Sequence, residues 1–117
     1  MASPYQVTEE TVERRARVVA ISGDLDMAAA PAFEARLLDC VGGDEPVILD
    51  LTGVGYMDST AVGALISARK KANMTRERFA IVCKPGDIRR MLEYTGLDAA
   101  FHVVGTREEA LARLSTG

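Results

Sequence analysis

Residues 46–72 read PVILDLTGVGYMDSTAVGALISARKKA and contain the pattern that decides the fold. The apolar run at 46–51 predicts a short strand that is buried on both faces. The glycine-bearing stretch at 52–57 predicts a loop, and Asp58 and Ser59 offer a side-chain cap to a helix over the rest of the stretch. This order of strand, loop and capped helix is typical of an α/β unit, in which functional groups lie at the carboxyl ends of the strands.

The same alternation continues on both sides of this stretch. Further strands are expected at residues 5–12, 17–22, 79–83 and 101–104. Residues 23–27 are expected to form a loop, and helices are expected to begin near Pro31, Pro85 and Thr106. Because a short polar turn joins the first two strands, these strands should pair antiparallel. The predicted fold class is therefore α/β, a single domain over residues 1–117 with a mixed, mostly parallel sheet of four to five strands and four helices. Residues 1–4 are expected to be disordered.

Composition limits the class of protein. The chain has 117 residues, of which 48% are hydrophobic, enough for one core. The residues expected in this core, each from a separate element, are Leu37, Leu65, Ile81 and Leu92. Fourteen basic and 17 acidic residues give a net charge of −3, which argues against nucleic-acid binding and against a polybasic contact with a membrane. The sequence shows no spanning segment and no signal peptide, so a cytoplasmic location is expected.

Cysteine and histidine are too few for most metal or nucleophilic sites. Cys40 and Cys83 are far apart and form no CxxC pair, and His102 is the single histidine. A zinc site would need all three side chains and a carboxylate to converge. We therefore interpret both cysteines as small buried hydrophobic residues.

Two predicted loops carry candidate functional side chains. The loop at 53–60 opens a helix, as phosphate-binding loops do, but it lacks the lysine and the spacing of those motifs, and Asp58 stands where an anion would dock. Ser59 could be a nucleophile at a strand-to-helix turn, yet the G-x-S-x-G elbow is absent and its only possible histidine base is His102 on another strand.

Two interpretations of these loops need no nucleophile. Asp24 and Asp26 in the upstream loop, together with Asp58, could share a divalent cation, although nothing in the sequence fixes their geometry. The simplest interpretation makes Ser59 the N-cap of the helix and nothing more.

The motifs themselves are similar to those of one family. Residues 49–63 closely resemble the signature of STAS-domain anti-sigma factor antagonists, an apolar strand and a loop followed by aromatic-Met-Asp-Ser-Ser/Thr-Gly-x-Gly. Residues 23–26, Gly-Asp-Leu-Asp, resemble the family's Gly-Asp/Glu-Leu-Asp at the end of the preceding strand. Residues 89–97 resemble its third helix and the Gly-Leu that follows. The resemblance covers nearly the entire chain, in order and at the expected spacing.

Three positions depart from the family pattern. Ala61 replaces the glycine that usually follows the Ser-Ser/Thr pair, which adds a methyl group in the first turn, where a kinase backbone would approach. Ala29 stands where a Ser or Thr often caps the first helix, and residues 75–78 replace a glycine pair. The last two changes are expected to cost local stability.

The resemblance implies a binding module that is switched by phosphorylation, and not an enzyme. Family members bind an anti-sigma factor that is also a serine kinase with the histidine-kinase-like ATPase fold, and this binding frees a sigma factor. The kinase then phosphorylates the first serine of the motif, here Ser59, and a serine phosphatase of the metal-dependent type restores binding. The residues implied at the phosphosite and the partner surface are Asp24, Asp26, Tyr56, Met57, Asp58, Thr60, Val62 and Gly63. No cofactor or bound metal is implied.

Two other functions remain open from the sequence. STAS-like domains also occur as cytoplasmic subunits of membrane transport systems, where they hold a transporter ATPase in place. A small enzyme that uses Ser59 or the aspartates would show turnover by the isolated domain. No base, metal cage or cofactor motif accompanies those residues, so this function ranks last.

Overall fold

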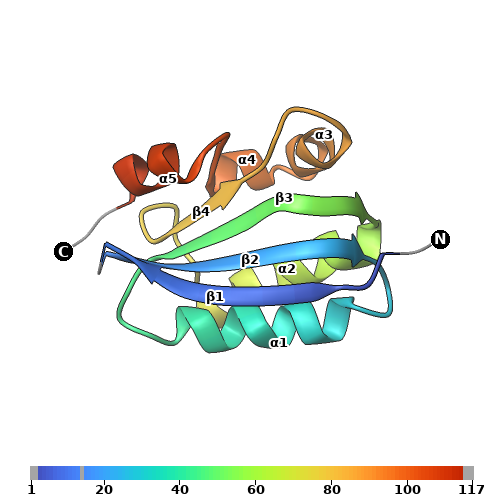
Figure 1. Cartoon of the computed structure of the whole chain (residues 1–117), viewed down its shortest axis with the longest axis horizontal. Helices are drawn as coiled ribbons and strands as arrows, with labels where there is room; N and C mark the ends of the chain where they lie inside the picture. The colour runs from blue at the N-terminus through green and yellow to red at the C-terminus, as the bar shows by residue number, and fades with distance from the viewer. Residues whose placement is uncertain (1–2, 14, 115–117) are drawn as a thin grey trace.

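The sheet has five strands in the order β1-β2-β3-β4-β5, with helices on both of its faces (Figure 1). The computed structural model describes residues 3–13 and 15–114. The strands are β1 Gln6–Val12, β2 Ala16–Leu25, β3 Val47–Met57, β4 Phe79–Val82 and β5 His102–Val104. The helices are α1 Ala30–Val41, α2 Ser59–Ala72, α3 Asp87–Tyr94, α4 Leu97–Ala100 and α5 Arg107–Arg113. Of the segment expected to be disordered, residues 1 and 2 lie outside the described residues.

Strand pairing confirms the predicted fold class. β1 pairs antiparallel with β2, and the pairs β2–β3, β3–β4 and β4–β5 are parallel. The single-turn helix α4 was not predicted, so there are five helices in the described residues instead of four. Four residues are too few for an apolar period of 3.6 to become visible in a sequence.

Two clusters of buried side chains hold the layers together. Helices α1 and α2 lie on one face of the sheet and α5 lies on the other (Figure 1). Leu37, Leu65, Ile81 and Leu92 are all fully buried in the larger cluster, as predicted. The smaller cluster forms where Ala110 and Leu114 meet the opposite face of the sheet.

The segments predicted as loops at 23–27 and 52–57 are mostly strand. β2 continues to Leu25 and β3 to Met57, and the two strands stay paired in parallel to their ends, with two irregularities in register. The prediction was wrong because the glycines in these segments are typical of loops, whereas here they allow close backbone approach. A Cβ on Gly53 would lie 3.0 Å from Cβ of Ser22 on the neighbouring strand.

Gly23 has a more specific role at the end of β2. Its φ of +84° lies in the region that favours glycine, and a Cβ there would lie 1.9 Å from the carbonyl oxygen of Pro4. The backbone of Ser3 and Pro4 therefore crosses directly over Gly23. This crossing brings the start of the described chain to the end of the sheet where β2 and β3 stop.

Both cysteines are buried and free, as interpreted from the sequence. Burial and the neighbouring Glu9 carboxylate, which accepts a hydrogen bond from Sγ at 3.2 Å, raise the pKa of Cys40 to about 12. The Cys40 thiol is therefore protonated at neutral pH. Among the helices of the described chain, none combines the length and the apolar character needed to cross a membrane.

Candidate functional site

The two motifs predicted to carry function meet at the carboxyl ends of β2 and β3. Asp24 lies opposite Tyr56 and Leu25 lies opposite Met57 in the parallel register. One residue further, the backbone N–H of Asp58 donates to the carbonyl oxygen of Leu25 at 3.2 Å. The strand pairing therefore fixes the start of α2 beside the end of β2.

Asp58, and not Ser59, is the N-cap of α2. Asp58 has an extended backbone, and its Oδ1 accepts a hydrogen bond from the N–H of Ala61 at 3.1 Å. The simplest interpretation, in which Ser59 is the cap, is thus wrong, because the cap position precedes the first helical residue and that residue is Ser59. The Ser59 hydroxyl has no capping role, and both Ser59 and the neighbouring Thr60 are exposed.

Asp26 holds the turn that leads into α1. Its Oδ1 accepts from the N–H of Ala29 at 3.1 Å, and its carbonyl oxygen accepts from the N–H groups of Ala29 and Ala30. Ala29 itself provides no side-chain cap, as expected from the missing Ser or Thr. The hydrogen bond that Asp26 accepts from Ala29 fixes the turn before α1 and does not replace this cap.

Asp24 is held by the first residues of the described chain. Its Oδ2 accepts from the N–H of Ser3 at 3.2 Å, and its own N–H donates to the carbonyl oxygen of Ser3 at 3.0 Å. Beside it, a groove of about 400 Å³ opens between Tyr5 and the start of α1, with Asp24 and Asp26 on its wall. We call Asp24, Asp26 and Asp58 the acidic rim.

The acidic rim is not arranged as a metal site. Each carboxylate accepts from a different backbone N–H, those of Ser3, Ala29 and Ala61 respectively. Within residues 3–13 and 15–114, no three His, Cys, Asp or Glu side chains are placed to share a metal ion. In the same residues no Lys or Arg forms an ion pair with any rim carboxylate. The rim is therefore a patch of negative charge whose geometry is set by hydrogen bonds with the backbone.

Exposure separates the remaining predicted site residues into two groups. Met57 and Val62 are buried, as is Val54. Their side chains belong to the core beneath the site and offer no surface to a partner. Tyr56 is 53% exposed and Gly63 is also exposed, with no atom within 4 Å of the Cβ position.

Met27 is a surface residue that the sequence reasoning missed. It follows Asp26 directly and is 70% exposed, more than Tyr56. A single methionine outside any predicted helix or strand carries no periodic signal. Only its place beside the Gly-Asp-Leu-Asp motif could have indicated it.

The substitution of Ala61 for glycine has a different consequence from the one expected. Ala61 is fully buried in the core cluster, so its methyl group points inward and not toward a partner. An alanine in a helix is also favoured over glycine by roughly 0.5–1 kcal/mol. The backbone that remains uncovered on α2 is that of Gly63, one turn after Ser59.

His102 is not arranged as a base for Ser59. It lies on β5, and the charged groups that act on it are Arg76, Arg113 and Glu77. Burial together with the two arginines lowers its pKa. The hydrolase interpretation therefore has no base in position beside the serine.

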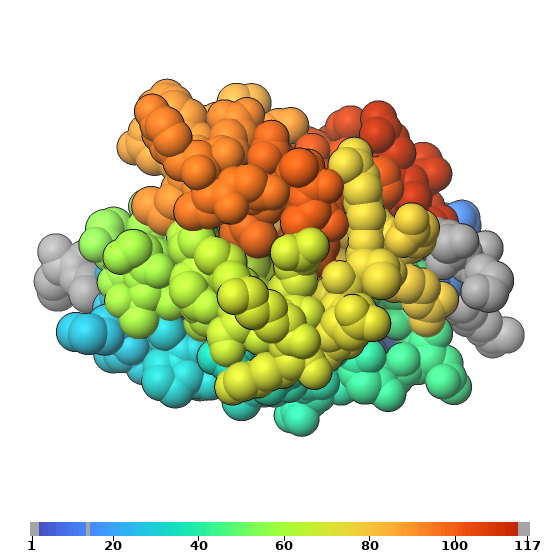
Figure 2. Space-filling view, turned by 180° about the vertical axis from the view of Figure 1, so that it is seen from behind, coloured from blue at the N-terminus to red at the C-terminus, as the bar shows by residue number. Residues whose placement is uncertain are grey.

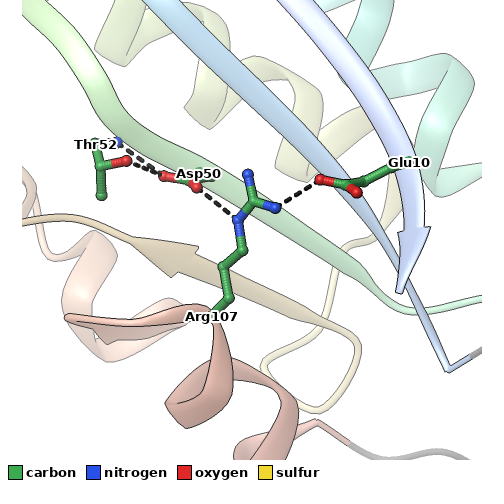
Figure 3. Close-up of polar contacts among 4 residues, drawn as sticks. All are labelled: Glu10, Asp50, Thr52 and Arg107. Carbon is green, nitrogen blue, oxygen red and sulfur yellow. Dashed lines mark hydrogen bonds and ion pairs between the residues drawn. The ribbon is translucent and has the colours of Figure 1, made fainter. Parts of the chain in front are cut away.

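A buried carboxylate that the sequence did not single out lies further back along β3. Asp50 Oδ1 accepts from the N–H and the hydroxyl of Thr52 at 2.9 and 2.7 Å, and Oδ2 accepts from Nε of Arg107 at 2.8 Å (Figure 3). The same guanidinium donates to Glu10 on β1 at 2.6 Å. Burial alone would raise the pKa of Asp50, but the hydrogen bonds from Thr52 and Arg107 outweigh burial and lower it. This network ties α5 to the sheet.

Comparison with known proteins identifies the family. The model of the STAS domain family matches residues 7–110. The chain belongs to the STAS domain family. It is 30% identical over 96 residues to the anti-sigma-B factor antagonist of Staphylococcus aureus (strain NCTC 8325 / PS 47), which covers 81% of this chain and 89% of the relative.

Solved structures agree with the STAS assignment. The crystal structure of an anti-sigma factor antagonist from Mycobacterium paratuberculosis is 28% identical, with a TM-score of 0.82 over 96% of this chain and 97% of that one. The Bacillus cell fate determinant SpoIIAA in the phosphorylated form is 21% identical, with a TM-score of 0.63 over 92% of this chain and 98% of that one, and shares the fold. The STAS family assignment made from the motifs is therefore confirmed.

Proposed function

We propose that this STAS domain is an anti-sigma factor antagonist whose unphosphorylated form binds a serine-kinase anti-sigma factor and thereby frees a sigma factor. The observation that carries the proposal is the position of Ser59, exposed as the first residue of α2 and flanked by Asp58 of the acidic rim. The relatives named as anti-sigma factor antagonists support the same role. The domain acts by binding, and catalysis belongs to its partner.

A phosphate on Ser59 is compatible with the folded state. The N–H groups of the first helical turn point toward this end of α2, and the helix dipole favours negative charge there. The N–H of Ala61 already donates to Asp58, so the N–H groups of Ser59 and Thr60 are the nearest remaining donors to the phosphate. Phosphorylation therefore changes the surface without unfolding the domain.

The same phosphate opposes binding of a partner. It adds about −1.5 to −2 charges beside the acidic rim, which has no cation of its own in the described residues. A partner that covers this surface would bury like charges together and pay an uncompensated desolvation cost. A kinase that phosphorylates Ser59 would therefore release its own product.

The partner surface follows from exposure around Ser59. Tyr56 near the end of β3 and Met27 just after β2 supply exposed apolar area, and Gly63 allows close approach to the backbone of α2. A serine phosphatase of the metal-dependent type would return the domain to its binding form.

The test uses a kinase-type anti-sigma factor from the same organism. The two purified proteins are mixed with and without ATP and Mg²⁺, and complex size and intact mass are measured. The expected result is a complex without ATP, and one added phosphate with loss of the complex after ATP addition. Peptide mapping should place the phosphate on Ser59, and a Thr60→Ala variant should still gain it. A stable complex with no added mass in ATP would contradict the switch.

A further inference from the structure

A second surface lies at the end of the sheet opposite Ser59. A pocket of about 240 Å³ opens between the C-terminal ends of α1 and α2 and the first residues of β3 and β4. Its apolar wall includes Val41, Ala72 and Met74, and its polar edge includes Glu45, Asn73, Thr75 and Arg78. The 14 residues of α2 span about 21 Å, so an occupant of this pocket would not touch the acidic rim.

Arg78 lines this pocket, and three further cations lie close to it in the chain, at the end of α2 and in the connection to β4. We call these four residues the basic patch: Arg69, Lys70, Arg76 and Arg78. In Figure 2 the yellow segment around residues 70–78 lies between the orange helices α3 and α4 and the turquoise helix α1. Arg69, Lys70 and Arg76 are exposed, and Arg78 is half-buried. The chain as a whole carries a net charge of −3, whereas this cluster is positively charged.

The charges of the basic patch are held in place but not neutralised. Arg69 lies over the ring of Phe101, with 5.9 Å between Cζ and the ring centroid, Arg76 donates to the carbonyl oxygen of Ala99, and Arg78 donates to that of Asp44. Within the described residues none of the four cations is within 4.0 Å of a carboxylate oxygen.

Two neighbouring cations, unlike those of the basic patch, lie close to carboxylates. Lys71 is paired with Glu34 at 2.8 Å, and Arg17 lies 3.9 Å from Glu45 on the edge of the pocket. Glu77 is the one acidic residue between Arg76 and Arg78 in the sequence. The basic patch therefore keeps an excess of positive charge.

The helix dipole explains only part of this cluster. Cations in the last turn of α2 are favourable at its negative end, which accounts for Arg69 and Lys70. Arg76 and Arg78 lie beyond the helix, in the connection to β4, and their guanidinium groups are fixed by carbonyl groups of other segments. Fixed guanidinium groups lose little freedom when they bind an anion, which suits them to recognition.

We propose that the pocket and the basic patch form a second docking surface, for an acidic segment of a partner protein that carries one short apolar side chain. The apolar side chain enters the pocket, and the flanking carboxylates meet Lys70, Arg76 and Arg78. Charge complementarity favours an acidic protein segment over nucleic acid, because the acidic rim and the negative net charge repel a long polyanion. The surface is independent of Ser59 and could be occupied while the kinase is bound.

The test is an NMR titration of the full ¹⁵N-labelled chain at low salt. The probe is the peptide acetyl-Asp-Glu-Leu-Glu-Asp-amide, with two controls, the same peptide with Ser in place of Leu and acetyl-Lys-Lys-Leu-Lys-Lys-amide. We expect saturable shifts of amides in residues 41–47 and 72–79 with the probe, at least threefold weaker binding of the Ser peptide, and no saturable shift with the basic peptide. Equal binding of the Leu and Ser peptides would overturn the role of the pocket.

Charge reversal tests the basic patch. A Lys70→Glu/Arg76→Glu variant should bind the probe at least tenfold more weakly, whereas Lys84→Glu/Arg90→Glu, which reverses two exposed cations elsewhere, should bind as the parent does. Melting curves of both variants check folding, and Lys70→Gln/Arg76→Gln replaces the first variant if it melts early. The proposal is overturned if the patch variant binds the probe as the parent does, or if the parent shows no saturable shift. It is also overturned if a duplex DNA oligonucleotide binds more tightly than the probe at the same residues.

Discussion

Nε of Arg107 lies 2.8 Å from Oδ2 of Asp50, so the first residue of α5 is tied to the middle of β3, 57 positions earlier in the chain. Asp50 is 7% exposed, and this contact and the hydrogen bonds from Thr52 satisfy its carboxylate. Asp50 lies within residues 49–63, but the resemblance assigned no role to it, and none was predicted for Arg107. The contact nevertheless fixes the layer on the face of the sheet opposite α1 and α2.

The first prediction concerns the loss of this contact. Arg107→Met keeps the apolar stem of the side chain but removes its donors, which leaves one oxygen of a buried carboxylate without its charged partner. We expect a loss of about 2 kcal/mol in the free energy of unfolding at pH 7, measured by urea denaturation. Glu10→Gln is the control, because that carboxylate is 59% exposed and its pair with Arg107 should be worth less than about 1 kcal/mol. Equal losses in both variants would show that the contact with Asp50 stabilises the fold no more than the exposed pair with Glu10 does.

Acid dependence provides a second prediction from the same carboxylate. The pKa of Asp50 is lower in the folded chain than the ordinary value, so ionised Asp50 favours folding. Its contribution is fully present above the unfolded pKa of about 4 and is lost as the pH falls through the lower, folded pKa. Asp50→Asn should therefore be less stable than the parent at pH 7, and the difference between the two should shrink below about pH 4. A difference that stays constant from pH 7 to pH 3 would contradict the lowered pKa.

The core offers a test of how α2 is oriented. Leu65 is fully buried in the larger cluster, and Leu65→Ala should lower the free energy of unfolding by roughly 2–5 kcal/mol. Met27→Ala serves as the surface control, because its side chain is 70% exposed and should change stability by less than about 0.5 kcal/mol. A loss at Leu65 as small as at Met27 would mean that α2 faces the other way.

The comparison of sequence and structure shows which signals were strong. Leu37, Leu65, Ile81 and Leu92 could be assigned to the core because apolar spacing reports directly on burial, and the antiparallel start of the sheet followed from one short turn. The ends of β2 and β3 were missed because Gly23 and Gly53 are typical of loops. Their function in strands depends on Pro4 and Ser22, contacts that a local pattern does not contain.

The candidate site was predicted at the level of motifs and not at the level of side-chain roles. The sequence placed Asp58 and Ser59 at the start of a helix, but which of them caps it depends on where the first helical hydrogen bond forms. That Ala61 faces inward depends on the rotation of α2, and that Met27 faces outward depends on the path of the chain after β2. A local sequence pattern contains neither. Asp50 and Arg107 meet only through the tertiary fold.

Gly63 provides a test that separates stability from binding. A glycine within a helix costs roughly 0.5–1 kcal/mol relative to alanine, and no neighbouring atom in this chain requires it. Gly63→Ala should therefore raise the free energy of unfolding by up to about 1 kcal/mol and weaken binding of the kinase-type anti-sigma factor about tenfold, since the added methyl group holds the partner away. Ala35→Gly on the exposed face of α1 is the matched control and should lose stability without a change in affinity. Higher stability with unchanged affinity would remove Gly63 from the partner surface.

The last prediction concerns the charge at the start of α2. Ser59→Ala should bind the kinase-type anti-sigma factor and remain bound after ATP is added, because the hydroxyl that would receive the phosphate is absent and Asp58 still caps the helix. Ser59→Asp should stay folded, since a carboxylate in the first turn is favoured by the helix dipole by about 0.3–1 kcal/mol. The same carboxylate joins the acidic rim, so affinity should fall at least tenfold, which corresponds to about 1.4 kcal/mol. Calorimetry with both variants and with Thr60→Asp, which puts the charge one residue further along, measures the effect. If Thr60→Asp weakens binding and Ser59→Asp does not, the switch lies at Thr60; if neither does, the acidic rim does not control the partner through charge.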